Sequence, residues 1–181
     1  METPLERTYE MAQEQKAFLN LAGEFAVASE LNRRQCLASV TYGASKSADV
    51  FVLSKDFSKV VRIEVKATDK KKWPIGARAI DPTGKRSGVI WVFVQFPSPL
   101  SGAPRSDSER GQHAPRFFVL TAAELYEAWR KEVDPYHAAY RRKHNREFDE
   151  SRGVPNISLA AVERFEGMWE KVIAAIGTAV S

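Results

Sequence analysis

The segment that decides the fold covers residues 49–66 and reads "DVFVLSKDFSKVVRIEVK". Two apolar runs flank a short polar stretch, a pattern typical of two strands joined by a hairpin. A loop centred on Asp56–Phe57 sets a register that places Asp49 opposite Glu64. Opposed residues of an antiparallel pair share one face, with Cβ atoms about 5 Å apart, and Lys66 shares it because strand side chains alternate. Two carboxylates and an amine are therefore expected to converge at a sheet margin.

Facing carboxylates need a physical explanation, because like charges opposed across two strands are destabilising by up to about 1 kcal/mol. A divalent cation provides one, since carboxylate oxygens are the preferred ligands of Mg²⁺. A nearby lysine can orient or deprotonate a water molecule at such a site. The alternative, that the triplet Glu64–Val65–Lys66 is the solvated face of an ordinary strand, stays open.

A helix is expected before the hairpin, from about Glu14 to Arg34. Its apolar face is expected to pack on the sheet and comprises Ala17, Phe18, Leu21, Phe25 and Ala28. Glu24 projects from near the edge of this face, where a carboxylate is costly unless it is paired or bound to metal. Gly23 beside it allows another backbone to approach closely. Pairing of Glu24 with a lysine at the helix edge is the alternative.

Further strands are expected on both sides of the hairpin. They are predicted at 36–42, at 88–96 and at 116–120. The second of these, "GVIWVFVQF", is almost continuously apolar, which favours a central strand buried on both faces. Two segments are rich in glycine, proline and polar residues. We interpret residues 73–88 as a loop or excursion from the sheet, and residues 97–115 as a long loop.

Helices are expected to follow the last strand. Thr121 and Glu124 form a capping box that starts one of them, and residues 134–152 are expected to be helical in part. Ser158 can cap a final amphipathic helix, whose apolar residues are Leu159, Val162, Phe165, Trp169, Val172 and Ile176.

The composition predicts a single soluble domain. The chain has 181 residues, of which 44% are hydrophobic and 28% charged, and its formal net charge is +4; these values are ordinary for a globular protein. No apolar run approaches the roughly 20 residues that span a bilayer, and the first residues lack the layout of a secretory signal. The single cysteine, Cys36, excludes an internal disulfide and a cysteine-based zinc cluster. We therefore expect a cytoplasmic protein without a membrane partner.

Basic residues gather in two places outside the hairpin. Lys70, Lys71 and Lys72 follow it directly, with Arg78, Lys85 and Arg86 after them, and a second cluster lies at 141–146 within "YHAAYRRKHNREF". Clusters of this kind suit a polyanion such as nucleic acid. The alternative for each is a solvated protein surface. Trp73, next to the lysines, is interpreted either as a core residue or as a ring that stacks on an unpaired base.

The order of these segments resembles the core of the PD-(D/E)XK nuclease superfamily. The segments are the helix "GEFAVASEL", the loop "YGASKSAD" and the strands "DVFVL" and "IEVKAT". Within it, the chain looks most like the archaeal Holliday-junction-resolvase type and related small bacterial endonuclease-like proteins. The resemblance covers residues 17–96 and, more loosely, extends to 121. It implies a restriction-endonuclease-like α/β fold, with an α-β-β-β-α-β core and a mixed central sheet flanked by helices. This core is expected at about 14–132 of a single domain spanning 1–181, with a C-terminal helical extension at about 133–181.

The resemblance also implies the catalytic residues. Asp49 matches the aspartate of the motif, Glu64 its second acidic residue, Lys66 its lysine, and Glu24 the helix glutamate that many members add. The acidic pair and the backbone carbonyl of Val65 are then expected to hold Mg²⁺, with Mn²⁺ able to substitute. The lysine contacts the attacking water or the scissile phosphate.

Nucleic-acid contacts are implied for the loop before the hairpin and for the lysines after it. The expected residues are Ser45, Lys46, Lys70, Lys71 and Lys72. The sequence departs from the motif at Ala48, where the motif name has proline, and this weakens the signature slightly.

The implied activity is metal-dependent hydrolysis of phosphodiester bonds in DNA by an endonuclease, with branched or otherwise structured DNA among the candidate substrates. The alternative is a catalytically inactive nuclease-fold protein that binds nucleic acid or a protein partner. A third possibility is an immunity or regulatory protein paired with a toxin. A homodimer, with the apolar last helix as its interface, is a further expectation.

Overall fold

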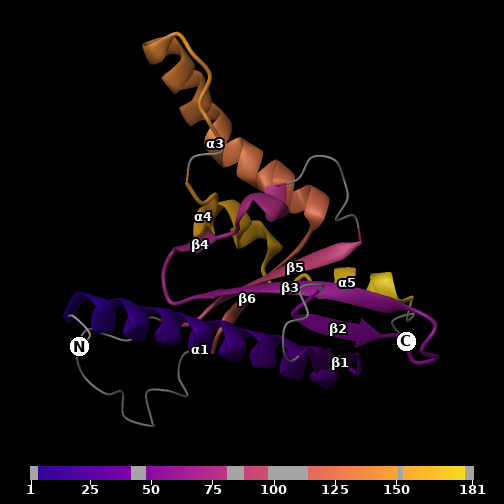
Figure 1. The fold of residues 1–181 in the computed structure, drawn as a ribbon. Coiled ribbons are helices and arrows are strands. Elements are labelled where there is room, and N and C mark those ends of the chain that lie inside the picture. Colours follow the sequence, from indigo (N-terminus) through magenta and orange to yellow (C-terminus); the bar gives the residue numbers. More distant parts are fainter. Residues whose placement is uncertain (1–3, 42–47, 81–87, 98–113, 151–152, 178–181) are drawn as a thin grey trace.

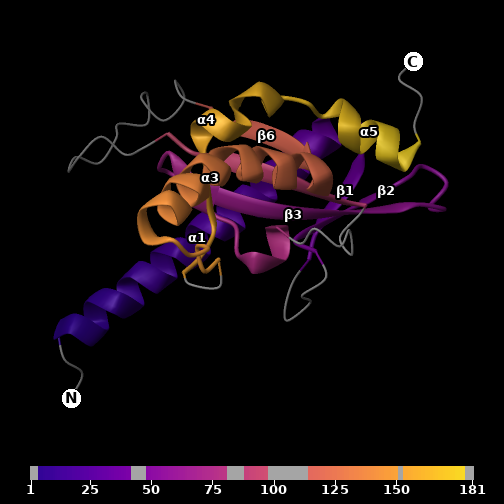
Figure 2. The same cartoon turned by 90° about the horizontal axis from the view of Figure 1, so that it is seen from above.

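The computed structural model of the chain describes residues 4–41, 48–80, 88–97, 114–150 and 153–177 (Figure 1). The elements are, in chain order, α1 (Pro4–Arg33), β1 (Leu37–Val40), β2 (Val50–Leu53), β3 (Val60–Thr68), β4 (Lys72–Pro74), the 3-10 helix η1 (Ala77–Ile80), β5 (Val89–Gln95), β6 (Arg116–Thr121), α3 (Ala122–His144), β7 (Asn156–Ser158), α4 (Leu159–Val162), the 3-10 helix η2 (Glu163–Phe165) and α5 (Glu170–Ile176). Figures 1 and 2 show α1 on one side of the main sheet and α3 on the other. The sheet is therefore the middle layer.

The main sheet is mixed, with five strands in the order β1-β2-β3-β5-β6. Strands β3 and β5 run parallel, and the other neighbouring pairs run antiparallel. This confirms the predicted α/β class, with an N-terminal helix, a mixed sheet, a helix after it and short C-terminal helices. The expected α-β-β-β-α-β order differs at its fifth element. The described residues between β3 and β5 form β4 and η1 instead of an α-helix.

The hairpin of β2 and β3 has the predicted register, with Leu53 opposite Val60. Its turn is held by Asp56, whose carboxylate accepts a hydrogen bond of 2.6 Å from the Ser54 hydroxyl and one of 3.1 Å from the Ser58 backbone N–H. Phe57 has a positive φ of 58°, which the tight reversal of the chain requires. The two strands are thus aligned by a short polar turn, as the sequence indicated.

Strand β5 is the buried central strand that its apolar run predicted. Residues 89–94 are all buried, because β5 lies between β3 and β6 and is covered on both faces. Trp73 of β4 is 0% exposed, and its indole Nε1–H donates to the Val94 carbonyl at 3.1 Å. The core interpretation of Trp73 is therefore confirmed, and its ring is not exposed for stacking on a base.

Each face of the sheet has its own apolar core. On one face, Val27 and Leu31 of α1 pack with Ile63 and Val65 of β3, and α5 contributes Val172. On the other face, the core joins β5, β6, β4, β7 and α3 through side chains that include Trp73, Trp91, Phe93, Phe118, Leu125 and Trp129. Residues beyond 133 therefore contribute to both cores, through β7 and α5.

Helix α1 buries only Ala28 of its predicted apolar face. Phe18, Leu21 and Phe25 are 65%, 37% and 45% exposed. The buried face is the one that contains Gly23 and Val27. A Cβ atom at Gly23 would lie 2.7 Å from the Cβ of Ala67, so the backbones of α1 and β3 approach closely here. This contact between a glycine and an alanine fixes which side of the helix faces the sheet.

The predicted last helix is broken into α4, η2 and α5. Ser158 caps only the first piece, where its hydroxyl accepts a hydrogen bond from the Ala161 N–H. Gly167, with a φ of 69°, lies in the turn before α5. The prediction of a single long helix was therefore wrong. The apolar spacing continues through a turn at which the Gly167 N–H donates to the Phe117 carbonyl of β6 at 2.9 Å.

Two expectations about partners are affected. The apolar residues assigned to the last helix, from Val162 to Ile176, are buried in the protein's own cores. They are therefore not available as the expected dimer surface. None of the helices in the described ranges is long and apolar enough to cross a membrane.

Candidate active site at the open edge of the third strand

Strand β3 is longer than its neighbour β2, and this difference creates an open edge. The β2 ladder ends at the pair Val50–Ile63, whereas the β5 ladder continues to Thr68. Within the described residues, β3 therefore has no strand partner on the β2 side beyond Ile63. Backbone groups at such an edge need other partners.

Asp49 supplies one of these partners. Its backbone N–H donates to the Ile63 carbonyl at 2.9 Å, and its carboxylate Oδ2 accepts the Val65 N–H at 2.7 Å. The two anchors of Asp49 thus lie on either side of Glu64 in β3, which is the position that the hairpin register predicted. The backbone carbonyl of Asp49 accepts the N–H of Thr41 at 3.0 Å, so the aspartate is held from both sides.

The backbone carbonyl of Val65 faces the same edge. In a strand, the N–H and C=O groups of one residue point to the same side, as the paired hydrogen bonds of an antiparallel ladder require. Because the Val65 N–H points to the Asp49 carboxylate, its carbonyl oxygen is directed to the open edge as well. The carboxylate of Asp49 and the carbonyl of Val65 therefore place oxygen atoms, both able to bind a cation, at the same edge of β3.

Glu64 and Lys66 project together from the sheet face that carries α3. Their register partners in β5 are Trp91 and Phe93, which belong to the core beneath α3. The Lys66 ammonium lies 6.0 Å from the centroid of the Trp91 ring. Both polar side chains are half-buried, so their charges are partly removed from water.

Glu24 reaches the same region from α1. Burial raises the pKa of this half-buried carboxyl, the charge of Asp49 raises it further, and the charge of Lys66 lowers it. Glu24 is therefore within electrostatic range of both residues, although α1 packs on the opposite face. The close contact of Gly23 with Ala67 of β3 brings the helix near enough for this.

The structure thus brings together Glu24, Asp49 and Lys66 electrostatically, with Glu64 between the two anchors of Asp49. Within the described ranges, no three or more histidine, cysteine, aspartate or glutamate side chains are placed to hold one metal ion. The candidate Mg²⁺ ligands therefore remain those that the resemblance implies: the carboxylates of Asp49 and Glu64 and the backbone carbonyl of Val65.

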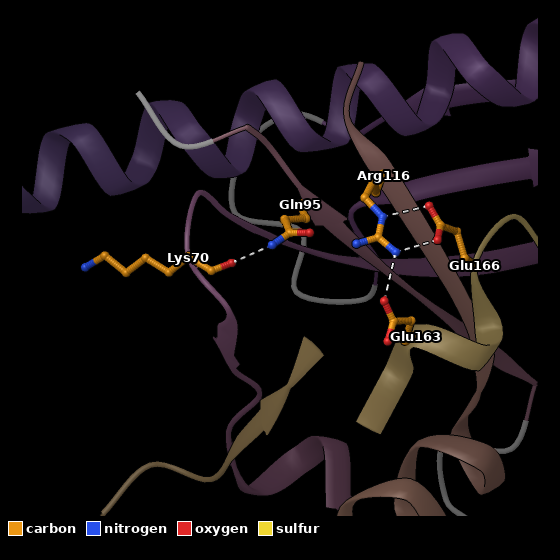
Figure 3. Close-up of polar contacts among 5 residues, drawn as sticks. All are labelled: Lys70, Gln95, Arg116, Glu163 and Glu166. Atoms are coloured by element: carbon orange, nitrogen blue, oxygen red, sulfur yellow. Dashed lines mark hydrogen bonds and ion pairs between the residues drawn. The ribbon is translucent and has the colours of Figure 1, made fainter. Parts of the chain in front are cut away.

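The predicted nucleic-acid residues are only partly described. Ser45 and Lys46 lie outside the described residues. Lys70, Lys71 and Lys72 are exposed and follow the open edge directly along the chain. Figure 3 shows the Lys70 backbone carbonyl accepting a hydrogen bond of 3.1 Å from the Gln95 side-chain amide, which ties the start of the lysine run to the end of β5.

Two features of this region escaped the sequence analysis. Trp91 lies beside Lys66 because β3 and β5 pair in parallel across a long crossover, and no local spacing signals this. Arg116, the register partner of Gln95, binds Glu166 at 2.6 Å and Glu163 at 3.3 Å (Figure 3). Its partners are about 50 residues away in sequence, so only the tertiary fold reveals them.

Comparison with protein-family models, with curated proteins and with solved structures finds no match.

Proposed function

We propose that this protein is a Mg²⁺-dependent endonuclease of restriction-endonuclease-like fold that hydrolyses phosphodiester bonds of DNA. The observation that supports it is the anchoring of Asp49 at the Val65 N–H. This contact aligns the aspartate with Glu64 and Lys66 at an open sheet edge. Helix α1, the β2–β3 hairpin and the parallel β3–β5 pair agree with that fold. The described part of the connection from β3 to β5 departs from it, because it contains β4 and η1 and no α-helix.

The residues fit a divalent cation of the hard, oxygen-binding kind. Mg²⁺ usually takes one or two carboxylates and completes its shell with water and substrate phosphate. Asp49, Glu64 and the Val65 carbonyl offer such a set. Burial, and then the charge of Asp49, raises the pKa of Glu24, whereas Lys66 lowers it; a bound cation would offset the repulsion between the two carboxylates.

Each side chain has a part that follows from its position. A divalent cation at this edge would supply activation of water and neutralisation of charge on the phosphate. Lys66 presents an ammonium on the same face as Glu64, where it can bind a phosphate oxygen or orient the water. Glu24 adds a carboxylate whose pKa is raised, first by burial, and a carboxylate of this kind can act as a proton acceptor. The exposed lysines 70–72 can bind flanking phosphates.

Calorimetric titration with Mg²⁺ or Mn²⁺ tests the cation site. The protein is expected to bind the ion, and Asp49→Ala is expected to abolish binding. Lys55→Ala, at an exposed lysine in the hairpin turn, is the control and should bind normally. Binding that survives Asp49→Ala would contradict the proposed ligands, and no binding by the unaltered protein would favour the inactive nuclease-fold alternative.

Cleavage of branched, nicked and single-stranded DNA tests the chemistry. Activity is expected to need the cation and to fall by about 10²-fold or more in Lys66→Ala, the scale of one electrostatic contribution to catalysis. Equal activity of Lys66→Ala and the unaltered protein would rule out this site as its source.

A further inference from the structure

Helix α3 continues well beyond the core that its first half builds. Its buried residues are Leu125, Ala128 and Trp129, and none of the described residues from 130 to 150 is fully buried. Figure 1 shows this second half rising away from the sheet and the chain returning along it. We refer to residues 130–150 as the α3 arm.

The α3 arm has a small aromatic cluster of its own. The ring of Phe148 lies 4.8 Å from that of His137 and 5.3 Å from those of Tyr136 and Tyr140. Asn145 ends the helix in a left-handed conformation and donates its N–H to the Arg141 carbonyl. The returning chain is thereby fastened to a helix end that would otherwise fray, because an unpacked helix terminus has little stability of its own.

Charges on the arm are arranged unevenly. Glu150 binds Arg130 at 2.9 Å and His137 at 3.2 Å, and Glu147 binds Arg141 at 3.0 Å. Glu150 and Glu147 are thus paired with arginines of α3 itself, Arg130 and Arg141.

Three further cations lie at the tip: Arg142, Lys143 and Arg146. All three are exposed, and no ion pair joins them to a carboxylate of the described chain. The Arg146 guanidinium donates to the Tyr140 hydroxyl at 3.1 Å and lies over that ring at 5.8 Å, so it is held in place. We refer to these three residues as the tip cations.

The arm projects from the face that carries the candidate active site. Trp129, at its root, packs in one core with Trp91 and Phe93, and Lys66 lies over Trp91. The helix rises about 1.5 Å per residue, so Lys143 is about 20 Å further along α3 than Trp129. A long polyanion that meets the tip cations can therefore extend across the same side of the molecule.

We propose that the α3 arm binds the phosphate backbone of duplex DNA through the tip cations. The proposal rests on the proposed function, since it takes DNA as the substrate of the edge at Asp49. Three exposed cations close together at the end of a helix suit the dense, regular charge of a duplex. The alternative is that these basic residues only stabilise the C-terminus of the helix through its dipole. That role would not explain the aromatic cluster that holds the returning chain against the helix.

The test is DNA binding by fluorescence anisotropy, with a labelled duplex, chelator present and Lys66→Ala as the non-cleaving background. The arm variant carries Arg142→Gln, Lys143→Gln and Arg146→Gln. The control carries Lys16→Gln, Arg33→Gln and Lys55→Gln, which remove the same charge at exposed positions on α1 and the hairpin. The Kd of each protein is measured between about 50 and 200 mM salt.

The arm variant is expected to bind at least about tenfold more weakly, with a salt slope reduced by about 2 to 3 units, or 0.9 per lost phosphate contact. The control should change far less. Equal loss in the two variants, or none in either, would overturn the proposal. Restoration of binding by Arg142→Lys with Lys143→Arg and Arg146→Lys would separate charge from folding, and failure of this rescue in a folded protein would overturn it too.

The outcomes also separate the arm from the proposed activity. An arm-dependent affinity in a protein that never cleaves DNA would refute the nuclease and leave the arm in place. Cleavage that depends on Lys66 but binding that ignores the tip cations would do the reverse.

Discussion

The carboxylate of Asp49 accepts a hydrogen bond of 2.7 Å from the backbone N–H of Val65, sixteen residues further along the chain. This contact replaces the strand partner that β3 loses where β2 ends. It also positions the aspartate beside Glu64, at the edge to which the Val65 carbonyl points. One interaction thus serves both the folding of the hairpin and the assembly of the candidate site.

Asp49→Asn and Asp49→Ala should separate these two roles. The amide oxygen of asparagine can still accept the Val65 N–H, so unfolding in urea should be close to that of the unaltered protein. Alanine leaves the N–H without its acceptor, which should cost about 1 to 3 kcal/mol. Both variants should lose cation binding in calorimetry. Equal stability of the two would argue that the contact is not structural.

Glu24→Gln should stabilise the metal-free protein near neutral pH. The pKa of Glu24 is raised, first by burial and then by Asp49, so the fold disfavours the charged form. For a raised pKa, the contribution of this group to stability is fully present below its unfolded value and is lost as pH rises through the folded value. The gain, expected to be under about 1 kcal/mol at this half-exposed position, should vanish below the ordinary pKa of 4.5.

Thermal unfolding of Glu24→Gln and the unaltered protein across this range measures the effect. Glu14→Gln, at an exposed position on the same helix, is the matched control and should show no such dependence. A gain that persists in acid would point to a cause other than the charge.

Gly23→Ala should displace α1 from β3. The added Cβ would lie 2.7 Å from the Cβ of Ala67, and overpacking of this kind typically costs about 1 to 3 kcal/mol. Because Glu24 is the next residue, its position relative to Asp49 should change as well, and cation affinity is expected to fall. The double variant with Ala67→Gly tests the cause, since it removes the clash. A double variant no better than Gly23→Ala alone would contradict this explanation.

Asp56→Ala should weaken the turn between β2 and β3. Hydrogen bonds from Ser54 and Ser58 lower the pKa of Asp56 to about 2. For a lowered pKa, the stabilisation is present above the unfolded value of 3.8 and is lost as pH falls through about 2. The difference in unfolding free energy from the unaltered protein should therefore disappear in strong acid. A difference that is equally large there would exclude the charge of Asp56 as its origin.

The sequence determined the local features whose signals lie within a few residues. The register of the β2–β3 hairpin follows from its turn and its alternating side chains, and the capping box of Thr121 and Glu124 follows from their spacing. The continuous apolar run of β5 likewise indicated a strand buried on both faces. Such features are predictable because the interactions that stabilise them are short-range in sequence.

Tertiary packing decided the rest. The pattern of α1 suggested that Phe18 and Leu21 would be buried, but the close contact between Gly23 and Ala67 turned another face inward. The apolar spacing after Ser158 suggested one helix, but the chain forms two short α-helices and a 3-10 helix, with a turn whose Gly167 bonds to the backbone of β6. The neighbourhood of Lys66 depends on β5, which reaches β3 only through a long crossover. These features depend on how surfaces from distant parts of the chain pack together. A local sequence pattern contains no information about that packing.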